Sequence, residues 1–272
     1  MKASLRESQK LMTTILRDFD KVCKKNDIKY WIESGTLLGA IRHGGFIPWD
    51  DDIDVGMLRE DYNRFLEIAK NDLPNDLVVN NFRNEKEARY QWSKIKHKYS
   101  RIVEDENNSL NEGLFIDIFP YDIYSNDNKC ELKLLKKKYK KQFSILYYKE
   151  LDKFQSNSDR LKSYFSKFLC SIIFKKTFSD ICNDISLNLK SINSIKNGVI
   201  SYGVEVVGYD NYLEISDIFP LKDINFEDIN VKCPNNIDKY LRNLYGEDYM
   251  KIPEEKDRFS HNNGIFIERE RA

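Results

Sequence analysis

Four aspartates within five residues are the part of this sequence best suited to chemistry. They stand at positions 50, 51, 52 and 54 of the stretch WDDDIDVG, residues 49–56. Successive side chains of an extended strand point to opposite faces, so Asp52 and Asp54 should share a face while their apolar neighbours turn toward a core. Asp50 has the same parity, and Asp51 is expected to point away from the others.

Two ionised carboxylates on one strand face repel each other, which makes their ionisation costly in a low-dielectric site. A divalent cation removes that cost, and Mg²⁺ prefers carboxylate and phosphate oxygens. We therefore expect Asp52 and Asp54 to bind Mg²⁺ or Mn²⁺. The alternative is a surface acidic turn that only adds solubility. Such a turn has no need of the apolar residues between the acids or of the glycine turns beside them.

A small-residue turn, Ser34-Gly35-Thr36, precedes the acids. It separates a strand predicted at 30–33 from an apolar helix start, so it should present backbone N–H groups and a hydroxyl at a helix N-terminus. That arrangement is typical of phosphate binding. A loop with a basic start, Arg42-His43, is expected to follow. We predict that the turn, Arg42, His43 and Asp50 bind substrate.

A strand, a Gly-Ser turn, a helix and an Asp-x-Asp strand follow one another as in the nucleotidyltransferase fold, which adds a third carboxylate from a neighbouring strand. Asp117 fits that role, because it is the one acid within the apolar stretch 114–119 and an unpaired buried charge is expensive. We predict that it is catalytic and binds metal. The alternative is a buried aspartate bonded to Arg42 or to a backbone amide.

The stretch GTLLGAIRHGGFIPWDDDIDVGMLREDY, residues 35–62, resembles the LicD family, whose bacterial members include phosphocholine transferases of cell-surface glycans. The fukutin-related proteins are distant relatives. The likeness is weak from 126 to 200. Further matching segments are WSKIKHKYS at 92–100, GLFIDIFPYD at 113–122 and YLRNLYGEDYMKIPEEKDR at 240–258.

Two positions refine the resemblance. The family usually has glycine where Ser34 stands, and serine before glycine is an accepted variant in the wider superfamily. In a strand predicted at 90–99, Lys94, Lys96 and Lys98 share one parity. Such a row is usually solvated, but beside a carboxylate–metal site it could contact phosphate oxygens. The family pattern matches Lys94, which we take as substrate-binding, and we expect Lys96 and Lys98 on the surface.

The resemblance implies a metal-dependent phosphotransferase. Its donor would be CDP-choline or a related CDP-alcohol, and its acceptor a sugar hydroxyl of a teichoic-acid, capsule or lipopolysaccharide precursor, including lipid-linked glycans. Choline, ethanolamine, glycerol and ribitol all remain possible. One alternative is a nucleotidyltransferase that uses an NTP. The other is a non-catalytic glycan-binding protein that kept the fold.

Composition narrows the class of protein. The 272 residues include 44 basic and 44 acidic side chains, and this balance does not favour nucleic acid as a partner. The five cysteines form no C-x-x-C pair, which indicates neither a disulfide framework nor a zinc site. The N-terminus lacks the apolar core of a signal peptide. We expect a cytoplasmic protein, with possible peripheral contact at the inner face of the plasma membrane.

The pattern of apolar residues predicts an α+β protein with a nucleotidyltransferase-like mixed sheet flanked by helices. A catalytic core is expected at 1–125, a mainly helical subdomain at 126–200, and a C-terminal portion that packs back on the core at 201–272. Helices are predicted at 4–26, 59–70, 131–149, 160–178 and 236–244, and strands at 30–33, 77–82, 90–99, 114–120, 226–227 and 231–234.

The segment 160–178 is both apolar and basic. As a helix it would gather aromatic and aliphatic side chains on roughly one side, with arginine and lysines around them. Most amphipathic helices turn their apolar face to a core, which here would be the catalytic domain. The alternative is a helix that rests in the headgroup layer of an anionic membrane.

Overall fold

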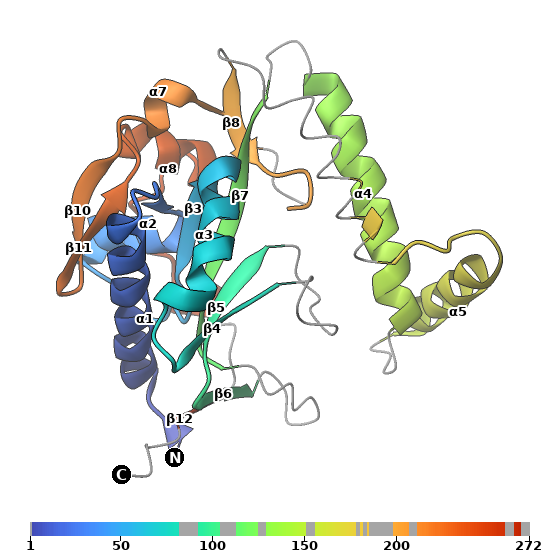
Figure 1. Ribbon diagram of the computed structural model, residues 1–272, viewed down its shortest axis with the longest axis horizontal. Coiled ribbons are helices and arrows are strands. Elements are labelled where there is room, and N and C mark those ends of the chain that lie inside the picture. Colours follow the sequence, from blue (N-terminus) through green and yellow to red (C-terminus); the bar gives the residue numbers. More distant parts are fainter. Residues whose placement is uncertain are drawn as a thin grey trace.

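The computed structural model describes residues 2–81, 92–103, 113–124, 129–150, 156–177, 180–181, 184, 198–206, 211–258 and 264–267. These residues form an α+β fold in which helices flank a mixed sheet (Figure 1), as predicted. Parts of the strands predicted at 77–82 and 90–99, and the end of the helix predicted at 160–178, lie outside the described residues. Among the helices in the described part, none has the length and apolarity needed to cross a membrane.

In the described part of the chain, the central sheet contains β2 (Trp31–Ile32), β3 (Asp54–Leu58), β4 (Leu77–Asn80), β5 (Ser93–His97), β7 (Phe115–Tyr124), β8 (Val199–Tyr202) and β9 (Leu213–Glu214). Its order is β2-β3-β7-β5-β4, and β8 joins the second half of β7 and carries β9. The β3–β7 pair is parallel, whereas β7 runs antiparallel to β5 and β8. The long strand β7 is therefore the strand to which both halves of the sheet attach.

The other elements surround this sheet. The remaining strands are β1 (Lys2–Ala3), β6 (Ser100–Val103), β10 (Lys222–Phe226), β11 (Ile229–Cys233) and β12 (Gly264–Ile267). The helices named below are α1 (Leu5–Lys25), α2 (Ser34–His43), α3 (Arg59–Asp72), α4 (Lys129–Glu150), α5 (Asn157–Ile172), α7 (Ile215–Ile218) and α8 (Ile237–Tyr245), and a 3₁₀ turn, η2, spans Glu255–Asp257. Strand β12 lies between β1 and β6, which brings the two ends of the chain together.

Helix α1 shows how local sequence and packing agree. Ser4 caps it by accepting the backbone N–H of Glu7, whose side chain reaches back to the N–H of Ser4. This capping box satisfies N–H groups that the first turn leaves unpaired. One face of the helix is fully buried at Met12, Leu16 and Phe19. Helix α1 packs with α3 on β7, so both helices support the strand that carries Asp117.

Two hydrophobic clusters divide the described residues. The larger contains α1, the central sheet and the C-terminal elements, with Phe226, Val231 and Tyr240 buried in it. The smaller joins the end of β7 to α4 through Tyr124, Tyr139 and neighbouring side chains. Figure 1 shows α4 and α5 standing away from the sheet, while β10, β11 and α8 lie against it. The C-terminal elements thus share the core of the N-terminal ones.

Among the element boundaries that differ from those predicted, two concern the site residues. Helix α2 continues through His43, so Arg42 and His43 form its last turn and do not begin a loop; Gly44 ends the helix with a positive φ of 73°. Strand β3 begins at Asp54, so the loop before it contains Asp52. The reason is tertiary, because the partner strand β2 has two residues and its pairing reaches only Val55 and Gly56. Alternation by itself does not show where a partner strand ends.

Arg59, at the start of α3, holds a buried ion cluster together. Its guanidinium donates to both carboxylate oxygens of Asp122 at 3.1 and 2.8 Å, and to Glu205 at 2.6 Å. The side chains of Asp122 and Glu205 are 0% and 6% exposed. One arginine therefore pairs with a carboxylate of β7 and with another from the segment just after β8.

Replacing Arg59 with methionine should lower the free energy of unfolding by about 3–5 kcal/mol, because it leaves two buried carboxylates without a counter-charge. Urea denaturation measures the loss. The matched control is Arg64→Met, whose ion pair with Asp61 is half exposed and should cost less than about 1 kcal/mol. Equal losses in the two variants would show that the buried cluster is not held by charge.

Candidate active site

Strand register brings three of the predicted site residues into one row. Asp54 of β3 stands opposite Asp117 of β7, and Asp117 stands opposite Lys94 of β5. Residues in register across adjacent strands project from the same face of a sheet. The backbone N–H of Glu33 donates to the carbonyl of Asp54 at 3.0 Å, which extends the row beyond β2. The row therefore places a lysine beside two aspartates that are 63 positions apart in the sequence.

The loop before β3 adds two further carboxylates. The side chain of Asp52 lies close enough to that of Asp50 for its charge and a hydrogen bond to raise the pKa of Asp50. Asp50 also lies over the first turn of α2, because a Cβ added at Gly35 would stand 3.0 Å from its Oδ2. Ile53 and Val55 are fully buried, as the alternation predicted.

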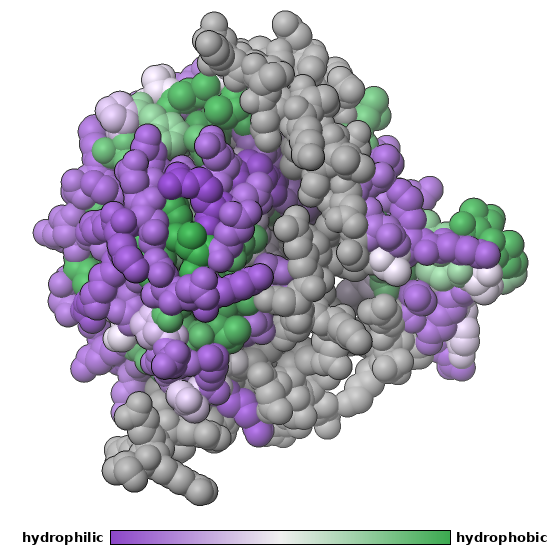
Figure 2. All heavy atoms as spheres, in the orientation of Figure 1, coloured by the Kyte–Doolittle hydropathy of each residue, from purple (hydrophilic) through white to green (hydrophobic). Residues whose placement is uncertain are grey.

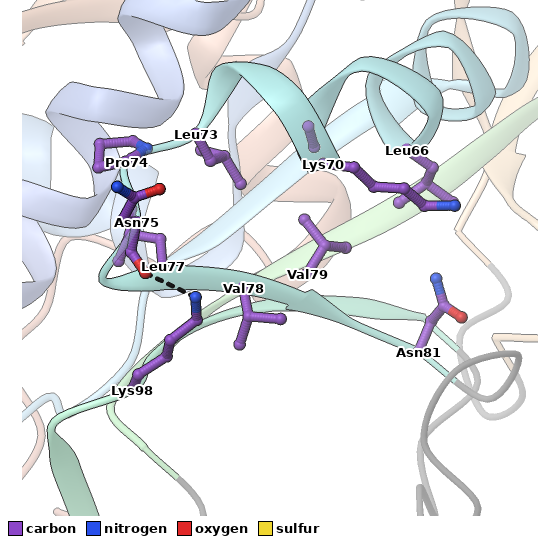
Figure 3. Close-up of a pocket in the computed structure, with 11 residues that line it drawn as sticks. Leu66, Lys70, Leu73, Pro74, Asn75, Leu77, Val78, Val79, Asn81 and Lys98 are labelled. Carbon is purple, nitrogen blue, oxygen red and sulfur yellow. Dashed lines mark hydrogen bonds between the residues drawn. The ribbon is translucent and has the colours of Figure 1, made fainter.

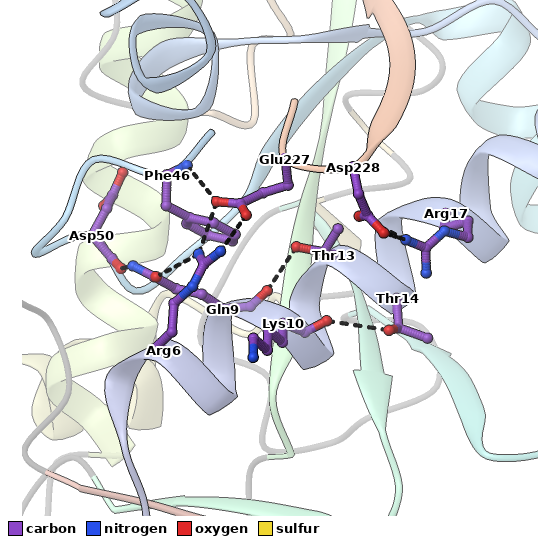
Figure 4. A network of polar contacts seen from close by, with 10 residues as sticks. All are labelled: Arg6, Gln9, Lys10, Thr13, Thr14, Arg17, Phe46, Asp50, Glu227 and Asp228. Atoms are coloured by element: carbon purple, nitrogen blue, oxygen red, sulfur yellow. Dashed lines mark hydrogen bonds and ion pairs between the residues drawn. The ribbon is translucent and has the colours of Figure 1, made fainter. Parts of the chain in front are cut away.

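Helix α1 and the β10–β11 turn hold this loop in place (Figure 4). The side-chain amide of Gln9 donates to the backbone carbonyl of Asp50 at 2.9 Å. Arg6 donates to Glu227 at 2.8 Å, and Glu227 in turn accepts the backbone N–H of Phe46 at 3.2 Å. Residues from both ends of the chain thus fix the segment that carries the acids.

The carboxylates raise one another's pKa values. Burial, followed by the charges of Asp52, Asp117, Glu33 and Asp50, raises the pKa of Asp54 well above its ordinary value. Burial, followed by the charge of Asp52, raises the pKa of Asp50 to about 8. Like charges in a poorly solvated site cannot all ionise without a counter-ion. The carboxylates of the cluster therefore repel one another, and a bound cation would reduce that repulsion.

The residues present fit a divalent cation in their chemistry. Asp52 and Asp54 offer hard carboxylate oxygens next to a helix N-terminus where a phosphate can complete the shell. Within the described ranges, no three His, Cys, Asp or Glu side chains already stand in coordinating geometry. The metal role of Asp52, Asp54 and Asp117 stays a prediction.

The turn at the start of α2 performs two structural tasks. Ser34 has a positive φ of 47°, a conformation that glycine adopts more easily than other residues. This explains why a glycine suits the position. The hydroxyl of Thr36 is buried and accepts the backbone N–H of Asp54 at 2.8 Å, which locks the helix to β3. The hydroxyl of Ser34 lies 3.4 Å from that of Tyr202.

Asp117 has side-chain partners other than Arg42. The indole N–H of Trp92 donates to its Oδ1 at 2.6 Å, and the Nζ of Lys94 lies 3.4 Å from the same oxygen. These contacts hold the carboxylate in one orientation. Lys94 is buried, and so is Lys96, which is 4% exposed. The expectation that Lys96 lies on the surface is wrong, because this face of the central strand β5 is covered in the folded chain.

Arg42 helps to hold the C-terminal segment, and His43 packs beside it. Arg42 donates to the backbone carbonyls of Tyr249 and Lys251, each at 3.1 Å. Burial lowers the pKa of the His43 imidazole, whose ring packs edge-on against Trp49. Their predicted substrate-binding role stays a prediction, since these contacts account for Arg42 without a ligand.

A buried carboxylate next to the turn escaped sequence reasoning. Glu33 accepts hydrogen bonds from the hydroxyls of Tyr121, of Tyr240 at 3.1 Å and of Tyr202 at 3.4 Å. Burial raises its pKa to about 8, against the opposing effect of these phenols. The signal was an acid inside a short apolar strand. Its partners were unforeseeable, because they come from β7, β8 and α8.

Tyr245, the last residue of α8, was also missed. It is 46% exposed, and burial of its hydroxyl end together with the charges of Asp54 and Asp50 raises its pKa. It therefore presents an aromatic ring next to the acids. The matching segment at 240–258 contained it, but only the folded chain brings α8 to this edge of the sheet.

A separate cavity of about 260 Å³ lies between α3 and β4 (Figure 3). Leu66, Leu73 and Val79 line it, and the ammonium group of Lys98 donates to the carbonyl of Asn75 at its rim. The carboxylate row does not contribute to this cavity. It is therefore not the predicted site.

The fold, the Asp-x-Asp pair and the Ser-Gly turn at a helix N-terminus define a nucleotidyltransferase-type domain. The sequence model of the LicD/FKTN/FKRP nucleotidyltransferase domain matches residues 27–163. The chain belongs to the LicD family, as its motifs predicted.

Three relatives illustrate the range of similarity. The chain is 30% identical over 263 residues to the lipopolysaccharide cholinephosphotransferase LicD of Haemophilus influenzae, a match that covers 96% of each chain. It is 34% identical over 95 residues to the ribitol 5-phosphate transferase FKRP of Mus musculus, or 35% of this chain and 17% of that protein. It is 56% identical over 54 residues to an uncharacterized protein of Rickettsia typhi, 20% and 18% of the two chains.

Gly35→Ala should weaken cation binding with little loss of stability, because its Cβ would push only on the movable carboxylate of Asp50. The matched control is Gly39→Ala. Its Cβ would come 2.4 Å from the backbone carbonyl of Gly45, and such overpacking costs about 1–3 kcal/mol. Thermal unfolding with and without Mg²⁺ separates the two effects. An unchanged Mg²⁺-induced shift in Gly35→Ala would remove Asp50 from the cation site.

In EDTA, the stability that Asp50 contributes should fall between about pH 5 and pH 8. Its pKa is about 8 in the folded chain and about 4 in the unfolded chain, so the folded state holds an extra proton in this window. The stabilisation by Asp50 is complete below the pKa of the unfolded chain and is lost as pH rises to the pKa of the folded chain. Asp50→Asn should therefore gain Tm relative to the parent as pH rises. Asp72→Asn, at a carboxylate whose pKa is lowered by Asn26 and Lys25, should show no such gain.

Proposed function

We propose that this chain is a metal-dependent phosphotransferase that moves a phospho-alcohol from a CDP-alcohol onto a sugar hydroxyl of a cell-surface glycan precursor. The observation that carries the proposal is the row of Asp54, Asp117 and Lys94 beside the N-terminus of α2. Two relatives support the reaction type, since one is a lipopolysaccharide cholinephosphotransferase and the other a ribitol 5-phosphate transferase. CDP-choline is the first donor to test, because the relative matched over nearly the whole chain is a cholinephosphotransferase.

The donor's pyrophosphate is the group that this site suits best. Backbone N–H groups at the start of α2 point toward an anion placed there, and the helix dipole favours negative charge. The ammonium group of Lys94 supplies a cation on the other side of Asp117. Asp52 and Asp54 would hold Mg²⁺ or Mn²⁺, which when bound neutralises the pyrophosphate and stabilises CMP as it leaves.

In this proposal, Asp117 acts on the acceptor. In the transfer, the acceptor oxygen forms a bond to the phosphorus that carries the alcohol, the bond from that phosphorus to the bridging oxygen of CMP breaks, and the hydroxyl proton passes to a carboxylate. Trp92 and Lys94 hold Asp117 in one orientation, so it is available to take that proton. Most of the remaining catalysis is positioning and charge stabilisation, as in other phosphoryl transfers.

A nucleotidyltransferase that uses an NTP is the second candidate, because the matching family domain carries that description. The same acids would then serve attack on the α-phosphorus and release pyrophosphate. Incubation with labelled CTP and with labelled CDP-choline distinguishes the two reactions, since only the phosphotransferase releases CMP from CDP-choline. A non-catalytic glycan-binding protein would consume neither.

The test is a panel of donors. CDP-choline, CDP-ethanolamine, CDP-glycerol and CDP-ribitol are each added with Mg²⁺ or Mn²⁺, and thermal unfolding and CMP release are followed. A ligand that binds only the folded state raises Tm. One donor that raises Tm and yields CMP in the presence of a glycan acceptor supports the proposal. Stabilisation by CTP alone, with release of pyrophosphate, would replace it.

Asp54→Asn should lower turnover by at least about 10³-fold with the fold intact, because a neutral amide is a poor ligand for a hard cation. Asp117→Asn should lower kcat while leaving donor affinity largely unchanged. Calorimetric donor titration and CMP release measure both quantities. Asp18→Asn, which breaks only a surface pair with Lys21, should match the parent. An equal loss of donor affinity in Asp117→Asn would place that residue in the donor site.

A further inference from the structure

Helix α5 turns a row of large apolar side chains to the solvent. Each is at least 57% exposed, and Ile173, just past the helix, is 75% exposed. The helical residues follow the spacing i, i+3, i+4, i+7 and i+11, which at about 100° per residue forms one stripe along the helix. Figure 2 shows this apolar surface at the protruding end of the molecule, where Figure 1 places α5. The row is Leu161, Tyr164, Phe165, Phe168, Ile172 and Ile173.

The opposite face of α5 is the one that contacts protein. Ser163 and Ser166 are buried, and the helix packs there against α4. The expectation that the apolar face of the segment packs on the catalytic domain is therefore wrong. A helix that presents serines to its neighbour and aromatic rings to water is inverted relative to an ordinary surface helix. Exposed apolar stripes of this kind mark contact surfaces.

Basic side chains border the stripe on both sides. Counting about 100° per residue, Arg160 and Lys167 lie on one flank and Lys162 on the other. Lys162 leans toward α4, where its Nζ donates to the hydroxyl of Tyr148 at 3.2 Å. Residues 129–150 and 156–177 together contain thirteen lysines and arginines and three acidic residues, although the whole chain has 44 basic and 44 acidic residues. The surface around the stripe is thus strongly positive.

We propose that α5 docks on the surface of an anionic lipid bilayer, with its apolar stripe in the headgroup–acyl boundary and its flanking cations on lipid phosphates. An amphipathic helix with aromatic residues on one face and lysines beside them suits that interface. The long stems of Arg160 and Lys167 can lie along the apolar layer while their charges reach the headgroups. The proposal depends on the exposed face alone and holds whichever donor the active site uses.

The charge around the stripe favours an anionic membrane over a second copy of the chain as its partner. A symmetric dimer through the stripe would bring the same patch of both subunits together, and hence lysines against lysines. An anionic membrane instead complements the positive border. Each nearby lysine or arginine strengthens such binding about fivefold at low salt.

Vesicle co-sedimentation of the full chain tests the proposal. The vesicles are phosphatidylcholine alone, or phosphatidylcholine with about 30 mol% phosphatidylglycerol. We expect binding to the anionic vesicles that falls as salt rises, and much weaker binding to the neutral ones. Equal binding to both, or none to either, would overturn the proposal.

Phe165→Gln with Phe168→Gln should weaken binding by at least about 100-fold, because each ring contributes apolar burial in the bilayer. Both rings are exposed, so Tm should stay within a few degrees of the parent. The matched control is Ile252→Gln, a 57% exposed side chain elsewhere on the surface, which should bind vesicles like the parent. Undiminished binding in the double variant would show that the stripe does not touch lipid.

If the Phe165 and Phe168 double variant unfolds, a variant that removes charge still tests vesicle binding. Arg160→Gln with Lys167→Gln should weaken binding about 30-fold at low salt. Lys10→Gln with Lys70→Gln removes the same charge from α1 and α3 and should have little effect. Light scattering on the same proteins provides the last outcome. A concentration-dependent dimer that the Phe165 and Phe168 substitutions abolish, without vesicle binding, would assign the stripe to a second copy and overturn the proposal.

Discussion

Repulsion among carboxylates at one edge of the central sheet is the constraint on which the site depends. Asp54 lies between Asp117 and Glu33 in register, and Asp50 and Asp52 approach from the preceding loop. Charges so close in a poorly solvated site favour protonation or a counter-ion. The raised pKa values of Asp50 and Asp54 are the direct expression of that constraint. Under the proposed function, a divalent cation bound together with the donor's pyrophosphate would relieve this repulsion.

The surrounding structure holds these carboxylates at fixed positions despite their mutual repulsion. The parallel β3–β7 pair sets the spacing of Asp54 and Asp117, and the hydroxyl of Thr36 ties α2 to the same strand. Gln9 fixes the backbone of Asp50 from α1. These contacts come from residues that are buried or paired, so they resist the outward push of the acids. The packing of the fold therefore keeps the carboxylates close together although their charges repel one another.

Glu33 shows why the C-terminal part of the chain belongs to the catalytic unit. Its phenol partners come from β7, β8 and α8, so the residue before the Ser-Gly turn is held from three places in the sequence. The segment with α4 and α5 contributes nothing described to this network. This segment instead carries the exposed apolar stripe with its basic border, which we assign to docking on a membrane surface and not to the transfer reaction.

The sequence by itself determined the local features. The alternation of acids and apolar residues predicted that Ile53 and Val55 are buried, the small-residue turn predicted the start of α2, and the long motif identified the family. These are matters of periodicity, turn chemistry and composition, which a short stretch contains in full. The tertiary structure alone decided where β3 begins, that Lys96 is buried, that Trp92 and Lys94 are the partners of Asp117, and that the apolar face of α5 is exposed. Each depends on which distant segment lies alongside, and pairing between strands and packing between helices are set by the whole chain.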